Sequence, residues 1–124
     1  MKVVIRADVL DGMLDAARRQ YPREFFCLLG GRWDGGTAKV EEIVFIPFKN
    51  SEHYVLFNPH DIPIDSRIIG SAHSHPRASP PSRADRRTFP KTGWVHLIVY
   101  PPFDRTSVGA HDARGRPIPL LIED

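Results

Sequence analysis

Prolines and glycines punctuate this chain from one end to the other. Twelve prolines and nine glycines are spread over 124 residues, with no internal repeat and no Ser/Gly-rich linker between them. Because these residues end helices and strands or reverse the chain, the sequence predicts many short elements and no disordered tract. A composition of 41% hydrophobic and 26% charged residues is typical of a compact fold. We expect a single domain over residues 1–124.

Three features bear on where the chain works and what it binds. No apolar run reaches the roughly 18 residues needed to cross a bilayer, and the N-terminal MKVVIRADVL lacks the apolar core of a signal peptide. The formal net charge of +2 falls short of the strongly basic character of nucleic-acid binders. The single Cys27 lies in apolar FFCLL, where a small buried hydrophobe is the ordinary role. We therefore expect a cytoplasmic protein that binds neither membranes nor nucleic acid.

The N-terminal half predicts one helix followed by a hairpin. Apolar residues recur at helical spacing over residues 8–20, with Asp8 expected as the N-cap and Pro22 as the stop. An apolar segment over 25–36 and a β-branched segment over 39–48 then predict a β-hairpin with a Gly-rich turn.

The rest of the chain predicts strands on either side of a second helix. We expect a strand over 67–75 that Pro76 ends, then a loop, then a helix over 82–89 that begins at a Ser82 cap. The other expected elements are a short strand over 53–57, a loop or single helical turn over 58–66, a strand over 94–100, and a closing hairpin of 106–111 with 117–123. This order predicts an α/β sandwich with a mixed or antiparallel sheet.

His73 and His75 are the two histidines whose spacing suggests chemistry. On an extended strand, residues two apart project from the same face with Cα atoms roughly 6.5 Å apart, so both imidazoles can bind one zinc ion. Ser74 between them would face the other way. The alternative is that alternate histidines are polar surface residues of a half-exposed strand.

Ser82 and Asp85 follow the histidine pair after a proline-rich loop. Taken alone, Ser-x-x-Asp is typical of a helix N-terminus with a capping box. Combined with His73 and His75, the carboxylate at this helix start supplies a third ligand and leaves the fourth position of a tetrahedral zinc open for water. The sequence therefore predicts a catalytic zinc site.

Glu24 is the candidate general base. A zinc-activated water still needs a group that accepts its proton and returns it to the leaving amine. Glu24 stands at the start of the apolar FFCLLGG segment, where an acid without a partner is out of place. The alternative interpretation is a solvated strand end.

Together these residues resemble the motif of the JAMM (MPN+) zinc metalloproteases. Glu24 in PREFFCLLGG, His73-Ser-His75-Pro and Ser82-Arg-Ala-Asp85 follow the order of that motif, and the resemblance covers nearly the whole chain. It implies an MPN fold, a cytidine-deaminase-like α/β/α sandwich with a mixed, largely antiparallel sheet. It also implies one Zn²⁺ per chain bound by His73, His75 and Asp85, with Glu24 as acid/base and Ser82 as a hydrogen-bond donor to the oxyanion.

One departure from the family pattern lies between His75 and Ser82. The segment PRASPP is one residue shorter than is usual in the family. We expect a tighter turn with the same ligands, and Asp65 or Asp104 would be the substitutes if Asp85 did not reach the metal.

The resemblance implies hydrolysis after the C-terminal Gly-Gly of a ubiquitin-like or sulfur-carrier protein, as in small archaeal and bacterial members of the family. The alternatives are a catalytically silent MPN scaffold that binds partner proteins, and a zinc amidohydrolase with a small substrate. A zinc deaminase is excluded, because the lone Cys27 cannot supply a Pro-Cys-x-x-Cys signature. Oligomeric state is not predicted.

Two further groups of residues are expected to be structural. His96 is predicted to be a hydrogen-bonded residue within the sheet. Arg83, Arg86 and Arg87 decorate the helix that carries Asp85, and such clusters are usually solvated surface; the alternative is that they steer an acidic protein substrate.

Overall fold

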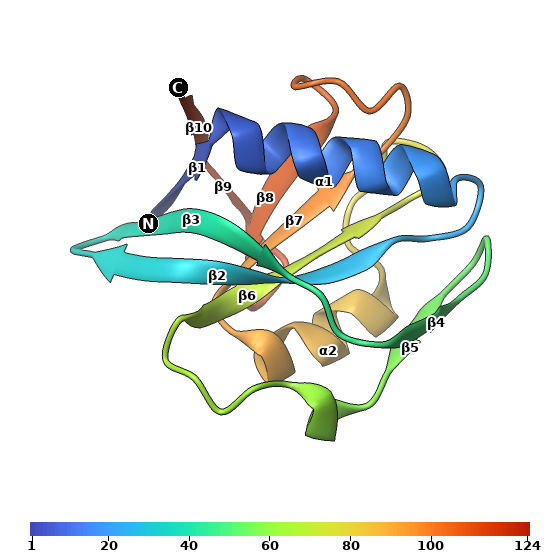
Figure 1. The fold of residues 1–124 in the computed structure, drawn as a ribbon, viewed down its shortest axis with the longest axis horizontal. Coiled ribbons are helices and arrows are strands. Elements are labelled where there is room, and N and C mark those ends of the chain that lie inside the picture. The colour runs from blue at the N-terminus through green and yellow to red at the C-terminus, as the bar shows by residue number, and fades with distance from the viewer.

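One twisted sheet runs through the protein in a computed structural model that describes residues 1–124. Helix α1 (Ala7–Gln20) lies on one face of the sheet and helix α2 (Arg83–Thr92) on the other (Figure 1). The strands of the sheet are, in spatial order, β10 (Leu120–Glu123), β1 (Lys2–Arg6), β3 (Thr37–Val44), β2 (Phe26–Asp34), β6 (Ile68–Ser74), β7 (Val95–Val99), β8 (Val108–Asp112) and β9 (Pro117–Ile118).

The sheet is mixed, with both kinds of strand pairing. The pairs β2–β3, β2–β6, β7–β8 and β8–β9 are antiparallel, whereas β1–β3, β1–β10 and β6–β7 are parallel. Parallel neighbours need a long crossover, and α2 provides it between β6 and β7. The predicted α/β/α sandwich with a mixed, largely antiparallel sheet is confirmed.

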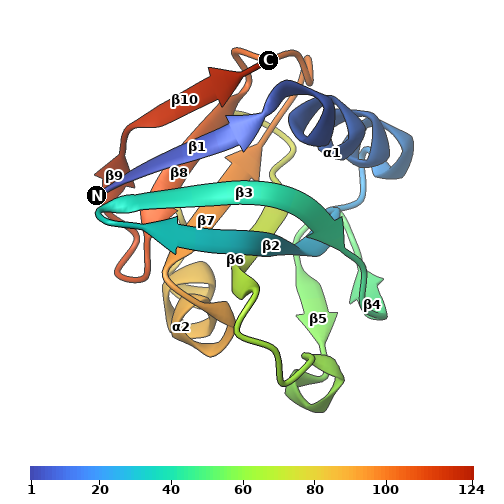
Figure 2. The ribbon, with the colours of Figure 1, turned by 60° about the vertical axis from the view of Figure 1, so that its left-hand side comes forward.

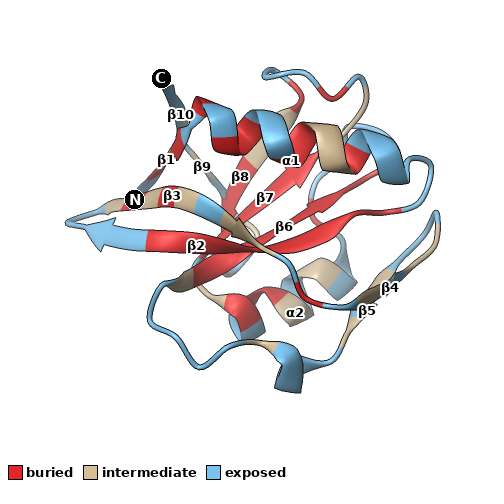
Figure 3. Ribbon diagram, in the orientation of Figure 1, coloured by how far each residue is buried: buried red, intermediate tan, exposed pale blue.

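The two faces of the sheet are packed differently. Under α1, apolar residues of the helix such as Leu10, Met13 and Leu14 pack on the strands in the main hydrophobic core. Burying each such side chain contributes roughly 1.5–3 kcal/mol. Strands β6 and β7 are buried nearly along their whole length, whereas β2 is buried at its start and exposed at its end (Figure 3). The face under α2 has a smaller core around Phe26 and Leu28, which leaves room for polar groups.

A short ribbon extends the α2 side of the molecule. It consists of β4 (Phe48–Asn50) and β5 (Val55–Phe57), followed by a 3-10 turn at Pro59–Asp61. Phe57 stacks on Phe26 of β2 with ring centroids 4.5 Å apart, which attaches the ribbon to the sheet. Figure 2 shows this ribbon and α2 projecting from the same side of the sheet. No helix is long and apolar enough to cross a membrane.

Two predictions about the chain ends were wrong or incomplete. Strand β1 was not predicted, although Val3 and Ile5 are buried in the alternation of a half-buried strand. The closing hairpin is limited to β8 and β9, because the chain continues past Pro119 into β10, which pairs with β1 instead. Proline lacks the N–H that would extend the β8 pairing.

The start of α1 also differs from the prediction. Arg6, not Asp8, is the N-cap, and no side chain caps this end. Asp8 instead lies in the first helical turn, where its carboxylate accepts hydrogen bonds from Arg6 Nε (3.1 Å) and Nη2 (2.6 Å). An acid in this turn still favours the helix, because it faces the positive end of the helix dipole.

Candidate active site

The sheet holds the candidate residues where β2 and β6 meet. Within this antiparallel pair, Phe26 lies opposite His73, and Ser74 N–H donates to the Phe25 carbonyl (3.0 Å). His75 N–H donates to the Val99 carbonyl of β7 (2.9 Å). The strand end that carries both histidines is therefore anchored to both of its neighbours.

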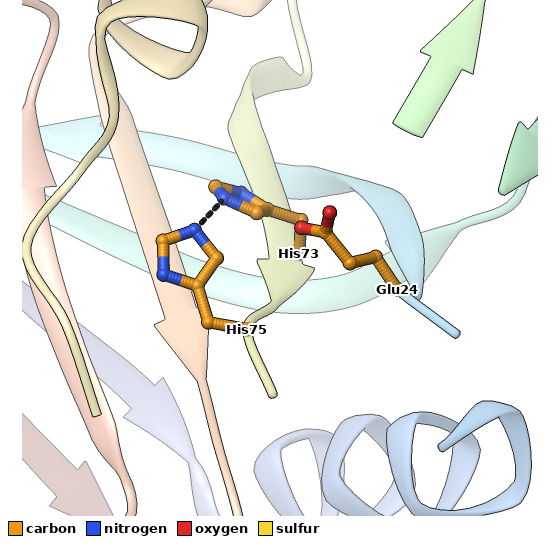
Figure 4. Close-up of side chains that lie close together, drawn as sticks. All are labelled: Glu24, His73 and His75. Atoms are coloured by element: carbon orange, nitrogen blue, oxygen red, sulfur yellow. Dashed lines mark hydrogen bonds between the residues drawn. The ribbon is translucent and has the colours of Figure 1, made fainter. Parts of the chain in front are cut away.

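The side chains alternate along this strand end as the sequence predicted. Ser74 faces away from the histidines, and its Oγ accepts a hydrogen bond from Phe25 N–H (2.7 Å). His73 and His75 share the other face, with 6% and 9% of their surface exposed. Figure 4 shows both imidazoles and the Glu24 carboxylate pointing toward one another from two segments of the chain.

Asp85 completes a compact triangle with the two histidines. The two Nε2 atoms are 3.0 Å apart, and the Asp85 carboxylate oxygens lie 3.2 Å from His73 Nε2 and 3.1 Å from His75 Nε2. A tetrahedral zinc with bonds of 2.0–2.1 Å keeps its ligand atoms about 3.3 Å apart. Two imidazoles and one carboxylate suit zinc in chemistry as well as in spacing.

The start of α2 fixes the Asp85 carboxylate. Ser82 is the N-cap of α2: Asp85 N–H donates to Ser82 Oγ (3.0 Å), and Ser82 N–H donates to Asp85 Oδ2 (2.8 Å). The shorter loop therefore still brings Asp85 to the histidines. Asp65 and Asp104 are bound in local turns instead, with Arg67 N–H and Thr106 N–H as their respective donors.

Glu24 is the second carboxylate beside the histidine pair. Ligand atoms of Glu24, His73 and His75 all lie within 4.8 Å of one another, so this trio is itself a possible metal cluster. Glu24 is only 7% exposed. Burial raises the pKa of its carboxyl to about 7; the His75 charge opposes this effect and the Asp85 charge adds to it.

Asp85 has the opposite electrostatic character. Burial by itself would raise the pKa of Asp85, but hydrogen bonds with His73 and His75 outweigh it and hold the pKa well below the usual range. The two carboxylates of the site therefore differ, because the pKa of Asp85 is lowered whereas that of Glu24 is raised. Such a division is typical of catalytic sites that pair a permanent charge with an acid/base group.

Ser79 is a contact of the site that the sequence did not single out. Its Oγ lies 2.6 Å from His75 Nδ1, and it also reaches the Arg77 carbonyl (3.4 Å). A hydrogen bond at Nδ1 fixes the tautomer of a histidine and leaves Nε2 for a metal. In the sequence Ser79 is one serine of a proline-rich loop, and no feature of that loop predicts its contact with His75.

The site forms the floor of an open cleft of about 340 Å³. The cleft is lined by Tyr54, Val55 and Phe57, which lie in or just before β5, and by Arg77 and Ala84, which lie in the loop before α2 and in α2 itself. Ser82 also lines the cleft, near the histidines and Asp85. A substrate can therefore reach the convergent polar groups from solvent.

The other singled-out residues have structural roles. His96 Nδ1 lies 2.8 Å from Ser71 Oγ, its Nε2 lies 3.1 Å from the Gly93 carbonyl, and its ring stacks on Phe89, as expected for a bonded residue inside the sheet. Cys27 is fully buried, and burial raises the pKa of its thiol far above the range of a reactive cysteine.

Two histidines and two carboxylates at the floor of a cleft, on a mixed sheet between two helices, define a metalloprotease-like hydrolase domain. Residues 6–111 match the family model of the prokaryotic homologs of the JAB domain, and the chain belongs to this family. A relative from Haloferax volcanii named "Probable metalloprotease" is 35% identical over 130 residues, which cover 98% of this chain and 80% of the relative.

Solved structures agree with this assignment. A crystal structure of a JAB1/MPN domain protein from Archaeoglobus fulgidus has a TM-score of 0.75 and 31% identity. A second solved structure, described as a metalloprotease-like JAMM zinc site in the proteasome and signalosome, has a TM-score of 0.71 and 26% identity. In both comparisons all of each chain is covered. The predicted JAMM/MPN+ resemblance is confirmed, and the neighbour with a zinc site supports a metal at the histidine cluster.

Proposed function

We propose that this chain, as a single domain over residues 1–124, is a zinc-dependent peptidase or isopeptidase that cuts after the C-terminal Gly-Gly of a ubiquitin-like or sulfur-carrier protein. The observation that carries the proposal is the triangle of His73, His75 and Asp85 at the floor of an open cleft, with Glu24 beside it. The "Probable metalloprotease" relative supports the reaction class.

We assign His73, His75 and Asp85 as the ligands of one zinc ion per chain. Asp85 contacts both Nε2 atoms at 3.1–3.2 Å, whereas Glu24 lies only within 4.8 Å of the pair. The closer carboxylate is the better ligand, and the more distant one has room for a water between itself and the metal position. Zinc in such a site supplies Lewis-acid catalysis and ionises water near neutral pH.

The remaining residues move protons and orient the substrate. Glu24 accepts a proton from the attacking water and returns it to the leaving amine, because its carboxylate lies beside the histidine pair without being the closest ligand. The Ser82 Oγ accepts from Asp85 N–H, so its own hydrogen remains free to donate to the oxyanion of the substrate.

The ribbon supports an extended tail as the substrate. Strand β5 pairs with β4 on one side only, and its residues Val55 and Phe57 line the cleft. An extended peptide can therefore add to the free edge of β5 by backbone hydrogen bonds and lead its last residues toward the histidines. Glycine at the end of the tail allows the closest approach of backbone to the site, since it has no Cβ.

The substrate is tested with matched tails on one folded protein. We expect the zinc-loaded enzyme to cut a ubiquitin-fold protein ending in Gly-Gly, extended by a peptide or joined to a lysine amine, directly after the second glycine. A leucine in place of that glycine should abolish cleavage while the folded body still binds. Mass spectrometry identifies the cut. Equal cutting of both tails, or cutting of unfolded casein at many positions, would indicate a general peptidase; cleavage of small amides alone would indicate an amidohydrolase.

A second experiment concerns Ser79. Because its Oγ lies 2.6 Å from His75 Nδ1, Ser79→Ala should weaken zinc binding by about 10- to 100-fold. Ser79→Thr keeps the hydroxyl and should retain most of the affinity. Competition with a chelating dye measures the zinc dissociation constant. An alanine variant that binds zinc as tightly as the wild type would show that the hydrogen bond does not orient His75.

A further inference from the structure

Five exposed arginines around α2 have no acidic partner. They are Arg77, Arg83, Arg86, Arg87 and Arg114, and none of them forms a salt bridge. Every other arginine of the chain except Arg23 does form one. The unpaired guanidinium groups are therefore concentrated in one region of the protein. We call these five residues the arginine face.

Three of these arginines are placed where a positive charge destabilises α2. Arg83, Arg86 and Arg87 lie in the first five residues of the helix, where the positive end of the helix dipole disfavours a cation. The only acid in that turn, Asp85, faces the histidines. Helix α1 has the favourable arrangement, with Asp8 in its first turn and arginines in its last. Helix stability does not explain the charges of α2.

The turn between β8 and β9 extends the arginine face. Gly115 has a φ of +82°, and a Cβ at this position would lie 2.8 Å from Arg86 Cγ and 3.6 Å from Pro81 Cβ. The turn therefore packs directly on the side-chain stem of Arg86, and Arg114 is the residue that precedes Gly115 in that turn. Arg77 lies on the wall of the cleft, so the arginine face extends to the entrance of the candidate active site.

We propose that the arginine face binds an acidic surface on the folded body of the protein substrate whose tail enters the cleft. This inference rests on the proposed function and specifies that the docking surface of the substrate is acidic. Guanidinium groups bind carboxylates through paired, charge-assisted hydrogen bonds, and a complementary field accelerates association. A nucleic acid fits less well, because Glu24, Glu52 and Asp85 line the adjoining cleft and would repel a phosphate backbone.

The test separates docking from cleavage by using three substrates. They are a Gly-Gly-tailed ubiquitin-fold protein with an acidic surface, the same protein with its surface carboxylates changed to amides, and the tail peptide alone.

The enzyme variant is Arg83→Glu/Arg87→Glu. The control is Lys2→Glu/Lys49→Glu, which changes the net charge equally at two exposed lysines outside α2. Glutamate near the N-terminus of α2 favours the helix, so the melting temperature should not fall.

We expect the Arg83→Glu/Arg87→Glu variant to raise KM for the acidic protein by about tenfold or more and to leave kcat unchanged, as the loss of electrostatic steering predicts. KM for the amide-substituted protein and for the peptide should change little. The wild-type KM for the acidic protein should rise with salt, and that of the variant should not. The control should match the wild type throughout.

Two different failures are distinguishable. Calorimetry measures binding of the acidic protein independently of cleavage. If the wild type binds this protein and the variant does not, but the wild type cuts none of the three substrates, the proposed function is wrong and the docking inference is retained. If all three are cut and the variant keeps the wild-type KM for the acidic protein, the docking inference is wrong. The docking inference is also wrong if the Arg83→Glu/Arg87→Glu variant binds the acidic protein as tightly as the wild type and loses affinity only for duplex DNA.

Discussion

Replacing Glu24 with glutamine is expected to lower turnover by on the order of 10²- to 10⁴-fold, the usual contribution of a general acid/base group. The amide has nearly the shape of the carboxyl but cannot accept the proton of the attacking water. Glu24 is buried, and its backbone N–H bond to the Ser51 carbonyl is unaffected by the change, so the fold should be retained. Steady-state kinetics and metal analysis are measured on the same preparation.

Zinc content decides how this result is interpreted. If Glu24 acts as the base, Glu24→Gln keeps zinc and loses turnover. If Glu24 is instead a ligand together with His73 and His75, the same variant loses zinc. Glu24→Asp is the matched control, because it keeps the carboxylate but withdraws it by one methylene, and its activity should lie between those of the wild type and the glutamine variant. Wild-type turnover in Glu24→Gln would remove this residue from the mechanism.

The local features of the fold could be predicted from short stretches of sequence. The apolar start of segment 67–75 and Pro76 at its end predicted the strand that carries His73 and His75, and Ser-x-x-Asp predicted the start of α2. Both depend on interactions between residues close in the chain, which a sequence shows directly. The one-residue shortening before Ser82 proved harmless to the geometry, because the capping box positions Asp85 from within the helix itself.

Features that depend on distant partners could not be predicted in the same way. Strand β1 is five residues long, and its partners β3 and β10 come from the second quarter and the very end of the chain. The bond between Ser79 and His75 depends on the path of a proline-rich loop, which no periodicity describes. The pairing of arginines depends on which acids lie nearby in space. The sequence could therefore single out the arginines of α2, but only the structure shows that they lack acidic partners and that Arg77 and Arg114 join them.

Replacing Asp85 with asparagine is expected to show whether Asp85 is a zinc ligand or only a helix cap. Asp85→Asn should lose most of the bound zinc, because the amide is a poor metal ligand and two histidines alone form a weak site. The asparagine oxygen can still accept the hydrogen bond from Ser82 N–H, so α2 and the melting temperature should change little. His73→Ala should lose zinc as well, because it removes one of the three assigned ligands.

Ser82→Ala provides the complementary control. It removes the Oγ that accepts from Asp85 N–H and should cost about 1 kcal/mol of stability, yet the Asp85 carboxylate remains and the protein should keep its zinc. Zinc per chain after dialysis and the melting temperature are measured for all three variants. If Asp85→Asn holds zinc as the wild type does while Glu24→Gln loses it, Glu24 is the third ligand and Asp85 is a cap. Loss of zinc in Asp85→Asn with retention in Ser82→Ala and Glu24→Gln is the pattern that the contacts of Asp85 with both Nε2 atoms predict.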